Sequence, residues 1–251
     1  HTSEDVGDEP LQFFKKFDNI SVAVDSDRTN GIKQLLKQNS PPEIVLLDDA
    51  FQHRKVKAKT YILLTKYNDL YVDDYILPSG NLRESRRGAE RADVIIVTKC
   101  PQNLISEEKN TIIKSLQIQK NQKVFFSTIK YSESIKGLER NFKIEELKQF
   151  EVLLITGIAN PNSLLKFLSE REIKFQHLNY PDHHNFSGND IEKINTTFNT
   201  IISDKKLILT TEKDFVRLEQ KLKKLYYLPI ETSFLENKKI FDKTIKTCII
   251  S

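Results

Sequence analysis

The chain has 251 residues with a formal net charge of +4, and 38% of them are hydrophobic while 29% are charged. This length accommodates one large domain or two small ones, and the apolar fraction suffices for a buried core. The sequence has no apolar run long enough for a transmembrane helix, no signal peptide, and two cysteines without metal or disulfide spacing, which fits a reducing cytosol.

Strand-like and helix-like segments alternate along the first half of the chain. Residues 20–25 alternate like a strand, and residues 28–38 carry apolar side chains at helical spacing. The apolar run that follows predicts a strand at 43–49 that is buried on both faces. The next predicted elements are a strand at 61–65, a basic helix at 82–91, a strand at 93–98, a helix at 106–117 and a strand at 123–129.

A second set of alternating elements follows a polar connection at 131–150. Its predicted members are a strand at 151–156, a helix at 161–171, a strand at 173–179, a helix at 188–202, a strand at 206–210, a helix at 212–225, and a strand at 225–232 with a short tail. This order predicts βαβ units, and hence an α/β protein with a mostly parallel sheet and helices on both faces. We place a domain boundary between a larger core at 1–149 and a smaller α/β lobe at 150–251.

The most informative segment is 47–54, which reads LDDAFQHR and overlaps the end of the predicted strand. Ligands bind at the carboxyl ends of strands in open α/β sheets. The adjacent Asp48 and Asp49 suit a Mg²⁺ ion that carries nucleotide phosphates. Gln52, His53 and Arg54 are polar groups in the same place that can contact an anionic substrate. The alternative is an ordinary strand that ends in an Asp-rich turn.

The sequence GDEP at 7–10 predicts the start of a helix, in which Asp8 is the cap and Pro10 lies in the first turn. The residues expected on its buried side are Leu11, Phe13, Phe14 and Phe17. In the functional interpretation, Asp8 accepts the proton of a hydroxyl that is being phosphorylated, because a carboxylate orients the attacking oxygen. The alternative is a capped helix without a catalytic role.

Three of the five histidines lie between 177 and 184, where a loop precedes a predicted helix. Asp182, His183 and His184 could bind a metal, but ligands adjacent in sequence rarely converge on one ion. A histidine paired with a carboxylate is the more economical functional interpretation, since histidine titrates near neutral pH and can assist a base. The alternative is a turn whose histidines are solvated or cap the next helix.

The predicted basic helix carries Arg83, Arg86, Arg87 and Arg91 at helical spacing, and Arg83, Arg87 and Arg91 are four residues apart. Guanidinium groups bind phosphate in a fork geometry, so this helix face could hold an anion. Arg28, which follows the predicted strand at 20–25, is a similar candidate. In both cases the alternative is a solvated basic surface.

A capping arrangement is predicted at the start of the helix near 212, where Thr211 is followed three residues later by Asp214. Lys213 lies between them and could contact a phosphate. The chain contains no G-x-x-x-x-G-K-[ST] and no G-x-G-x-x-G. The main device for holding a triphosphate is therefore absent from these 251 residues.

Taken together and in order, these segments resemble the tetraacyldisaccharide 4′-kinase family, the lipid A 4′-kinases of Gram-negative bacteria. The resemblance spans nearly the whole chain, and the ordered set of motifs, with DDAFQHR among them, is specific. The segments that carry it are 6–10, 23–28, 48–54, 77–84, 94–99, 157–161, 182–183 and 210–214.

The resemblance implies a P-loop NTPase-like core with a smaller C-terminal α/β lobe. The implied reaction transfers the γ-phosphoryl group of ATP to the 4′-hydroxyl of a tetraacyldisaccharide 1-phosphate, with Mg²⁺ as the cofactor. It further implies a peripheral protein at the cytoplasmic face of the bacterial inner membrane. Its implied partners are the lipid A disaccharide precursor and the membrane surface.

By family similarity, the candidate residues divide into three roles. Asp8 would be the general base, assisted by His183 from the C-terminal lobe. Asp48 and Asp49 would serve the Mg²⁺ ion. The residues that would line the substrate or phosphate site are Glu9, Arg28, Gln52, His53 and Arg83.

The chain departs from the family pattern in two ways. Ala50 stands where the family has glycine, which matters only if that position needs a positive φ. The family's Walker A loop precedes Gly7, whereas this chain has no methionine and begins with His1, so we expect an inactive fragment of a longer kinase. The alternative is a non-catalytic relative that binds an anionic glycolipid or a protein partner. Nucleic-acid binding would rest on charge alone, and no recognisable module supports it.

Overall fold

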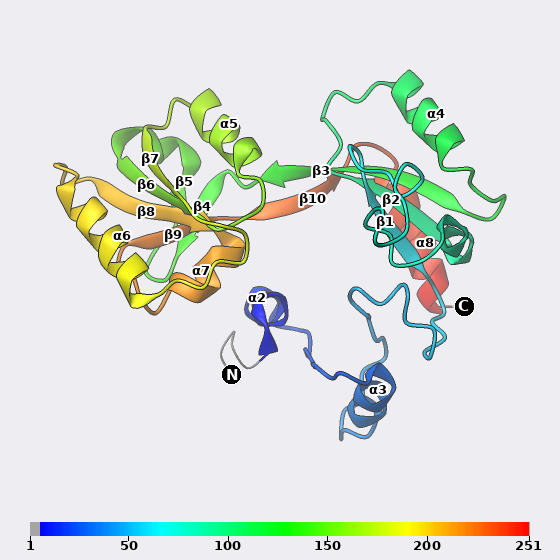
Figure 1. Ribbon diagram of the computed structural model, residues 1–251. Helices are drawn as coiled ribbons and strands as arrows, with labels where there is room; N and C mark the ends of the chain where they lie inside the picture. The colour runs from blue at the N-terminus through cyan, green and yellow to red at the C-terminus, as the bar shows by residue number, and fades with distance from the viewer. Residues whose placement is uncertain (1–5, 251) are drawn as a thin grey trace. The chain divides into compact units, whose positions relative to one another are not determined.

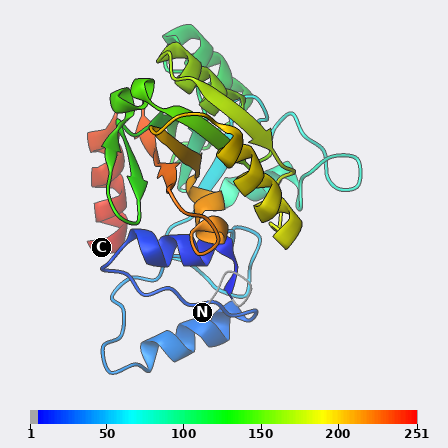
Figure 2. The same ribbon diagram turned by 90° about the vertical axis from the view of Figure 1, so that its left-hand side faces the viewer.

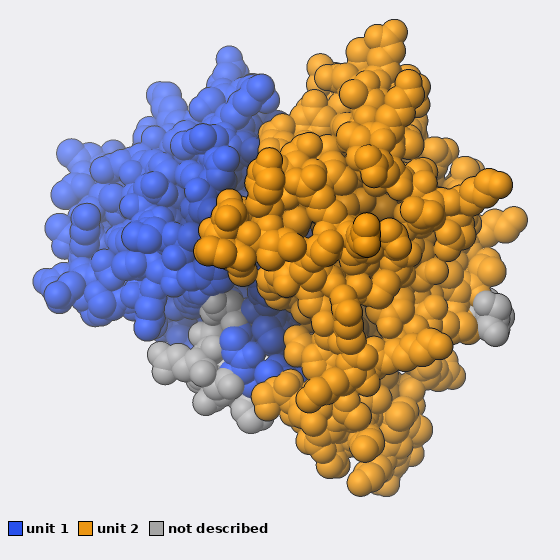
Figure 3. Space-filling model, turned by 45° about the vertical axis from the view of Figure 1, so that its right-hand side comes forward, with its two compact units in different colours: residues 1–24, 131–231 blue, residues 25–130, 232–251 orange. Residues whose placement is uncertain are grey.

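The computed structural model describes residues 6–250, and the side chains of Asp8 and Ile250 lie outside the described part. The chain divides into two compact units (Figure 3). Unit 1 contains the chain up to residue 24 together with 131–231, and unit 2 contains 25–130 together with the chain from 232 onward. This grouping does not test the domain boundary placed between 149 and 150, which stays a prediction.

Unit 1 is built on a six-stranded sheet in which four strands are parallel (Figure 1). The strands, in their order across the sheet, are β5 (Phe142–Lys143), β4 (Ser134–Gly137), β9 (Leu225–Leu228), β8 (Lys206–Thr211), β6 (Glu151–Thr156) and β7 (Phe175–Asn179). Strands β9, β8, β6 and β7 run parallel, whereas β4 is antiparallel to both of its neighbours. The carboxyl ends of β6, β7 and β8 therefore meet at one edge.

Helices cover both faces of the unit 1 sheet because successive side chains of a strand point to opposite faces. The helical elements are α2 (Asp8–Lys16), the 3₁₀ helix η2 (Ile144–Gln149), α5 (Asn162–Glu170), α6 (Gly188–Thr200) and α7 (Glu212–Leu218). Leu154 of β6 packs with Leu164 of α5, while its neighbour Ile155 packs with Ile194 of α6. Helix α2 lies beside α7 (Figures 1 and 2).

Unit 2 contains a four-stranded sheet in the order β1 (Ile62–Lys66), β2 (Val94–Thr98), β3 (Lys123–Tyr131) and β10 (Ile230–Phe234). Strands β1, β2 and β3 are parallel. The helical elements are α3 (Arg28–Leu36), the 3₁₀ helix η1 (Arg86–Arg91), α4 (Ser106–Ser115) and α8 (Lys238–Ile250). Ile95 packs with Ile112 of α4, and its neighbour Ile96 packs with Phe241 of α8.

The predicted α/β class, with mostly parallel strands and helices on both faces, is confirmed. The predicted strands at 61–65, 93–98, 123–129, 151–156, 173–179 and 206–210 all form within two residues of the predicted bounds. Among the described residues, no helix combines the length and the apolar character needed to cross a membrane.

The predicted strands at 20–25 and 43–49 are wrong, because both segments are irregular and exposed. Leu46 is 90% exposed and Ile44 is 48% exposed. A strand exists only when its backbone groups pair with a neighbour, and no described strand pairs with either segment. Apolar patterning alone cannot supply that partner.

Five further expectations need correction. The basic helix at 82–91 is reduced to η1, and the connection at 131–150 contains β4, β5 and η2, while the tail ends in α8. Helix α2 begins at Asp8 with Gly7 as its cap residue, so Asp8 does not cap it. Of the four apolar residues expected on its buried side only Leu11 is buried, and Phe14 is 62% exposed.

We predict that replacing Leu209 of β8 by alanine lowers the free energy of unfolding by about 2–5 kcal/mol, because it leaves a cavity in the buried core. Leu209 is fully buried, whereas the control Leu138 is exposed. Leu138→Ala should change stability by less than about 0.5 kcal/mol. Urea denaturation of both variants measures the difference, and equal effects would contradict this description of the core.

Candidate functional site

The candidate residues divide between the two units. Asp8, Glu9 and His183 belong to unit 1, and the side chain of Asp8 lies outside the described part. The candidates in unit 2 are Arg28, Asp48, Asp49, Gln52, His53 and Arg83. Each group is described within its own unit, and the roles of these residues stay predictions.

In unit 2, an ion pair joins two of the candidates. Arg83 donates to both carboxylate oxygens of Asp49, at 2.5 and 3.1 Å. This bidentate contact lowers the pKa of the Asp49 carboxyl, and the charge of Arg28 at the start of α3 lowers it further. Arg28, Asp49 and Arg83 are therefore brought together as two cations around one exposed carboxylate.

Gln52 and His53 lie in a turn closed by a bond from the His53 amide to the Ala50 carbonyl, at 2.9 Å. The Oε1 atom of Gln52 and the Nε2 atom of His53 are buried without a hydrogen-bond partner among the described residues. Buried polar atoms are normally paired, so both atoms are suited to a ligand. The positive φ in this loop is at Asp49 and not at Ala50, so alanine fits where the family has glycine.

Sequence reasoning missed the role of Glu84. Its carboxylate accepts from Arg91 at 2.6 Å and from Arg54 at 2.8 Å, and Arg91 lowers its pKa most. Arg91 also donates to the carbonyl of Phe51, so it ties the 47–54 loop to η1 instead of facing a phosphate. The signal available in the sequence was a glutamate directly after Arg83 in a segment rich in arginine.

In unit 1, the carboxyl ends of β6, β7 and β8 form a second polar group. Thr156 at the end of β6 donates to Asn179 Oδ1 at 3.0 Å and contacts His177 Nε2 at 2.8 Å. Burial lowers the pKa of His177. Ligands bind at this edge of parallel sheets, and the loop after β7 carries Asp182 and His183.

Asp182, His183 and Lys213 contact one another. The ammonium of Lys213, in the first turn of α7, lies 3.0 Å from Asp182 Oδ1 and 3.0 Å from His183 Nε2. The His183 amide also donates to Asp182 Oδ1, and His183 has a left-handed φ of 57°. Hydrogen bonding from Lys213 is the main cause that lowers the pKa of Asp182.

His184 has a different environment from His183. Its Nε2 atom lies 3.0 Å from Asp190 Oδ2, and its ring packs against Tyr180 and Phe186. The alternative that a histidine of this loop caps the next helix therefore describes His184, because Asp190 belongs to the capping box of α6.

Asp214 holds the start of α7 to the end of β6. Its side chain is fully buried, and Oδ2 accepts from the Gly157 amide at 2.8 Å and from the Thr211 hydroxyl at 2.7 Å. Thr211 in return accepts from the Asp214 amide, which confirms the predicted capping arrangement. A Cβ atom added at Gly157 would lie 2.9 Å from Asp214 Oδ1, so this close approach needs glycine.

Helix α2 is attached to α7 by two ion pairs. Lys16 donates to Glu212 at 3.0 Å, and Lys15 pairs with Glu219. Glu212 is buried, so its partner matters more than an exposed one would. These contacts fix the helix that begins at Asp8 against the helix that carries Lys213.

No group of three or more His, Cys, Asp or Glu side chains among the described residues is arranged to hold a metal ion. Mg²⁺, however, needs only one or two carboxylates from a protein, together with phosphates and waters. The adjacent exposed carboxylates Asp48 and Asp49 fit that donor set.

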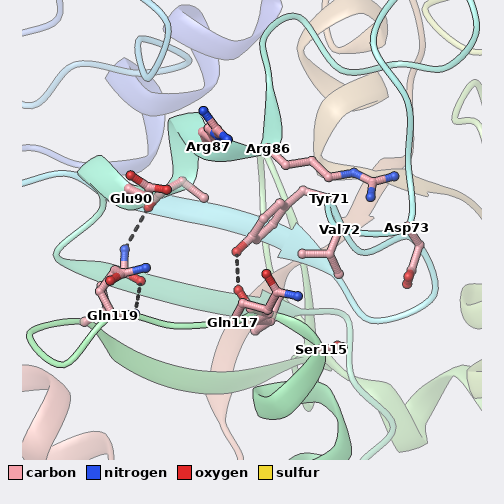
Figure 4. A pocket seen from close by; sticks show the side chains of 12 residues that line it. Tyr71, Val72, Asp73, Arg86, Arg87, Glu90, Ser115, Gln117 and Gln119 are labelled. Carbon is pink, nitrogen blue, oxygen red and sulfur yellow. Dashed lines mark hydrogen bonds between the residues drawn. The ribbon is translucent and has the colours of Figure 1, made fainter.

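A hollow of about 410 Å³ lies elsewhere in unit 2 (Figure 4). Arg86 and Arg87 are the candidates named from the sequence that line it. Two of its polar groups are engaged internally, because Tyr71 donates to the Leu116 carbonyl at 3.1 Å and Arg86 donates to the Asp74 carbonyl at 2.7 Å. We assign no substrate to this hollow.

Comparison with known proteins gives a consistent result. The model of the family "Tetraacyldisaccharide-1-P 4′-kinase" matches residues 1–249. The protein named tetraacyldisaccharide 4′-kinase from Flavobacterium johnsoniae is 47% identical over 245 residues, which cover 97% of this chain and 70% of that protein. The protein of the same name from Flavobacterium psychrophilum is 49% identical over 247 residues, with the same two coverages.

A solved structure is also similar. The crystal structure of the "apo" form of LpxK from Aquifex aeolicus in complex with ATP matches with a TM-score of 0.73 and 25% sequence identity. The match covers 99% of this chain and 71% of that one.

We predict that replacing two glycines by alanine changes the stability of the protein differently. Gly157→Ala should destabilise the protein by about 1–3 kcal/mol, because the new methyl group collides with the Asp214 carboxylate. Gly188 of α6 has open space around its Cβ position, so Gly188→Ala should be neutral or stabilising by up to about 1 kcal/mol. Urea midpoints of both variants measure this, and destabilisation by Gly188→Ala alone would contradict it.

We predict that the pKa of Asp190 is about 2, below its ordinary value of 3.8, because it accepts hydrogen bonds from Ser187 and then from His184. Its stabilising contribution is therefore present above pH 3.8 and is lost as the pH falls through about 2. Ser187→Ala should raise this pKa in a ¹³C NMR titration and leave the Asp182 value unchanged. An unshifted Asp190 pKa in the variant would refute the assignment.

Proposed function

The chain belongs to the tetraacyldisaccharide-1-P 4′-kinase family, and on this premise we propose that it phosphorylates a tetraacyldisaccharide 1-phosphate in lipid A biosynthesis. ATP donates its γ-phosphoryl group to the 4′-hydroxyl of that lipid. The observation that carries the proposal is the family match, which extends over residues 1–249.

In the proposed reaction, a bond forms between the 4′-oxygen and the γ-phosphorus, and the bond from that phosphorus to the bridging oxygen of ADP breaks. The proton of the 4′-hydroxyl passes to the carboxylate of Asp8, and His183 assists from the loop after β7. The proposal is supported by the packing of α2 on α7, since these helices carry Asp8 and the lysine bound to His183. Phosphoryl transfer needs positioning and charge stabilisation more than covalent help.

The residues of unit 2 would handle the phosphates. Asp48 and Asp49 would hold Mg²⁺, which neutralises phosphate charge when bound. Arg28 and Arg83 would contact the phosphates directly. The unpartnered atoms of Gln52 and His53 support a role in substrate recognition, and Glu9 of unit 1 would also contact the substrate.

A lipid substrate favours a location at a membrane surface, and the proposed location is the cytoplasmic face of the bacterial inner membrane. Helix α2 supports peripheral contact, because Phe13 and Phe14 are exposed on it and Phe17 is exposed at its C-cap. The net charge of +4 is favourable toward anionic lipid. Co-sedimentation with anionic vesicles tests this, with Phe14→Ser expected to bind less.

A non-catalytic, lipid-binding relative is the second candidate, and the absence of a phosphate loop from these 251 residues is the observation that favours it. Because the chain covers 70% of the F. johnsoniae relative, the deciding experiment uses a chimera in which this chain replaces the matching region of that protein. A chimera that binds the lipid but transfers no phosphate from labelled ATP would support this alternative.

In this chimera, we predict that Asp8→Asn or His183→Ala lowers turnover about 10²–10⁴-fold, because the first removes the proton acceptor and the second removes the group that assists it. The measurement is transfer from γ-labelled ATP to a disaccharide 1-phosphate lipid. Asp18→Asn, an exposed change shortly after α2, is the control and should keep normal turnover. A double variant with normal turnover would remove the proposed mechanism. Asp49→Ala should instead shift the Mg²⁺ titration.

A further inference from the structure

We propose that Lys213 is a positioning residue for His183 and that its ammonium fixes the imidazole as the neutral tautomer with its hydrogen on Nδ1. The proposal rests on the role proposed above for His183 in phosphoryl transfer, and it adds a residue to that site.

The geometry of three groups defines the tautomer. An ammonium has hydrogen-bond donors and no acceptor, and Lys213 Nζ lies 3.0 Å from His183 Nε2. That nitrogen must therefore offer its lone pair, which leaves the ring hydrogen on Nδ1. Nε2 also lies 4.0 Å from Asp182 Oδ2, a contact that would favour a protonated Nε2. The shorter contact is a hydrogen bond and the longer one is not, so the lysine decides the tautomer.

Lys213 is itself held in place from two sides. It follows Thr211 and precedes Asp214, which cap one another and bind the end of β6. Its ammonium also donates to Asp182 Oδ1 at 3.0 Å, and Lys213 in turn lowers the pKa of Asp182. An ionised Asp182 and a charged Lys213 therefore stabilise one another at neutral pH.

His183 needs such a partner because packing alone does not fix its ring. Its side chain is 62% exposed, in contrast with His184, whose side chain is 25% exposed and lies between two aromatic rings. The left-handed backbone at His183 sets the direction of the side chain, and the lysine sets its rotation. A ring held in this way does not lose rotamer freedom when the substrate binds.

The tautomer assigns the roles of the two catalytic candidates. With Nε2 bound to Lys213, the free edge of the imidazole carries the Nδ1–H donor. His183 can then donate to a carboxylate or to the 4′-oxygen, and it cannot accept the substrate proton at the occupied nitrogen. The proton consequently goes to Asp8, and His183 orients the oxygen atoms around it.

The first test is NMR of the ¹⁵N-labelled 251-residue chain. Long-range ¹H–¹⁵N spectra are recorded at about pH 8, where an ordinary histidine is neutral, and His183→Gln assigns the signals. The wild-type ring should be the Nδ1–H tautomer. Lys213→Met should move it toward Nε2–H, because hydrogen-bond partners set the tautomer. Lys221→Met is the control, since Lys221 donates to the Phe186 carbonyl and should leave His183 unchanged.

The second test is kinetic and uses the chimera. Lys213→Met should lower kcat about tenfold to hundredfold through loss of orientation and leave KM for ATP within about twofold. Lys213→Arg, which keeps charge and donors, should recover part of kcat. An Nε2–H tautomer in the wild-type chain, or an unchanged tautomer in Lys213→Met, would overturn the proposal. An inactive parent chimera would count against the proposed function, while the NMR result would still decide the role of Lys213.

Discussion

A buried carboxylate connects the elements from which the unit 1 site is built. Asp214 has no access to solvent, so its Oδ2 atom can accept hydrogen bonds only from groups of the protein. Those donors are the Gly157 amide at the end of β6 and the Thr211 hydroxyl at the end of β8. The carboxylate therefore fixes where α7 begins relative to two parallel strands. The position of Lys213, and through it of His183, follows from that single anchor.

The second helix of the site is fixed by charge. Lys15 and Lys16 at the end of α2 pair with Glu219 and Glu212 on α7. The apolar contribution of α2 is small, since only Leu11 of its large apolar residues is buried. The helix that begins at Asp8 is therefore held to unit 1 by two ion pairs together with the buried Leu11. In unit 2, Glu84 has a comparable role, because it connects Arg54 and Arg91 across the 47–54 loop.

The sequence predicted those elements whose signal is local. Strand β6 and strand β2 are continuous apolar runs with a neighbouring strand on each side, and Thr211 with Asp214 is a cap within four residues, so both kinds of feature were found. The segment 43–49 looks like the same kind of run, but it has no pairing partner among the described strands. Pairing is a property of two segments, and one segment cannot reveal it.

The candidate site shows the same difference between features that are local in the sequence and features that are not. Asp182 and His183 stood out by composition, but the contact with Lys213 spans 30 residues and depends on a left-handed backbone at His183. Neither feature has a pattern in the sequence. The family resemblance supplied the candidate residues, and the geometry supplied which of them contact one another within each unit.

The ion pair between Asp49 and Arg83 has a consequence for the proposed binding of a divalent cation and a phosphate in unit 2. Each partner now neutralises the other. A divalent cation that takes the carboxylate sets the guanidinium free, and a phosphate that takes the guanidinium sets the carboxylate free. Binding of the cation would therefore raise the affinity for phosphate. By thermodynamic reciprocity, binding of phosphate would raise the affinity for the cation by the same factor. Metal and nucleotide would enter such a site more readily as a pair than separately.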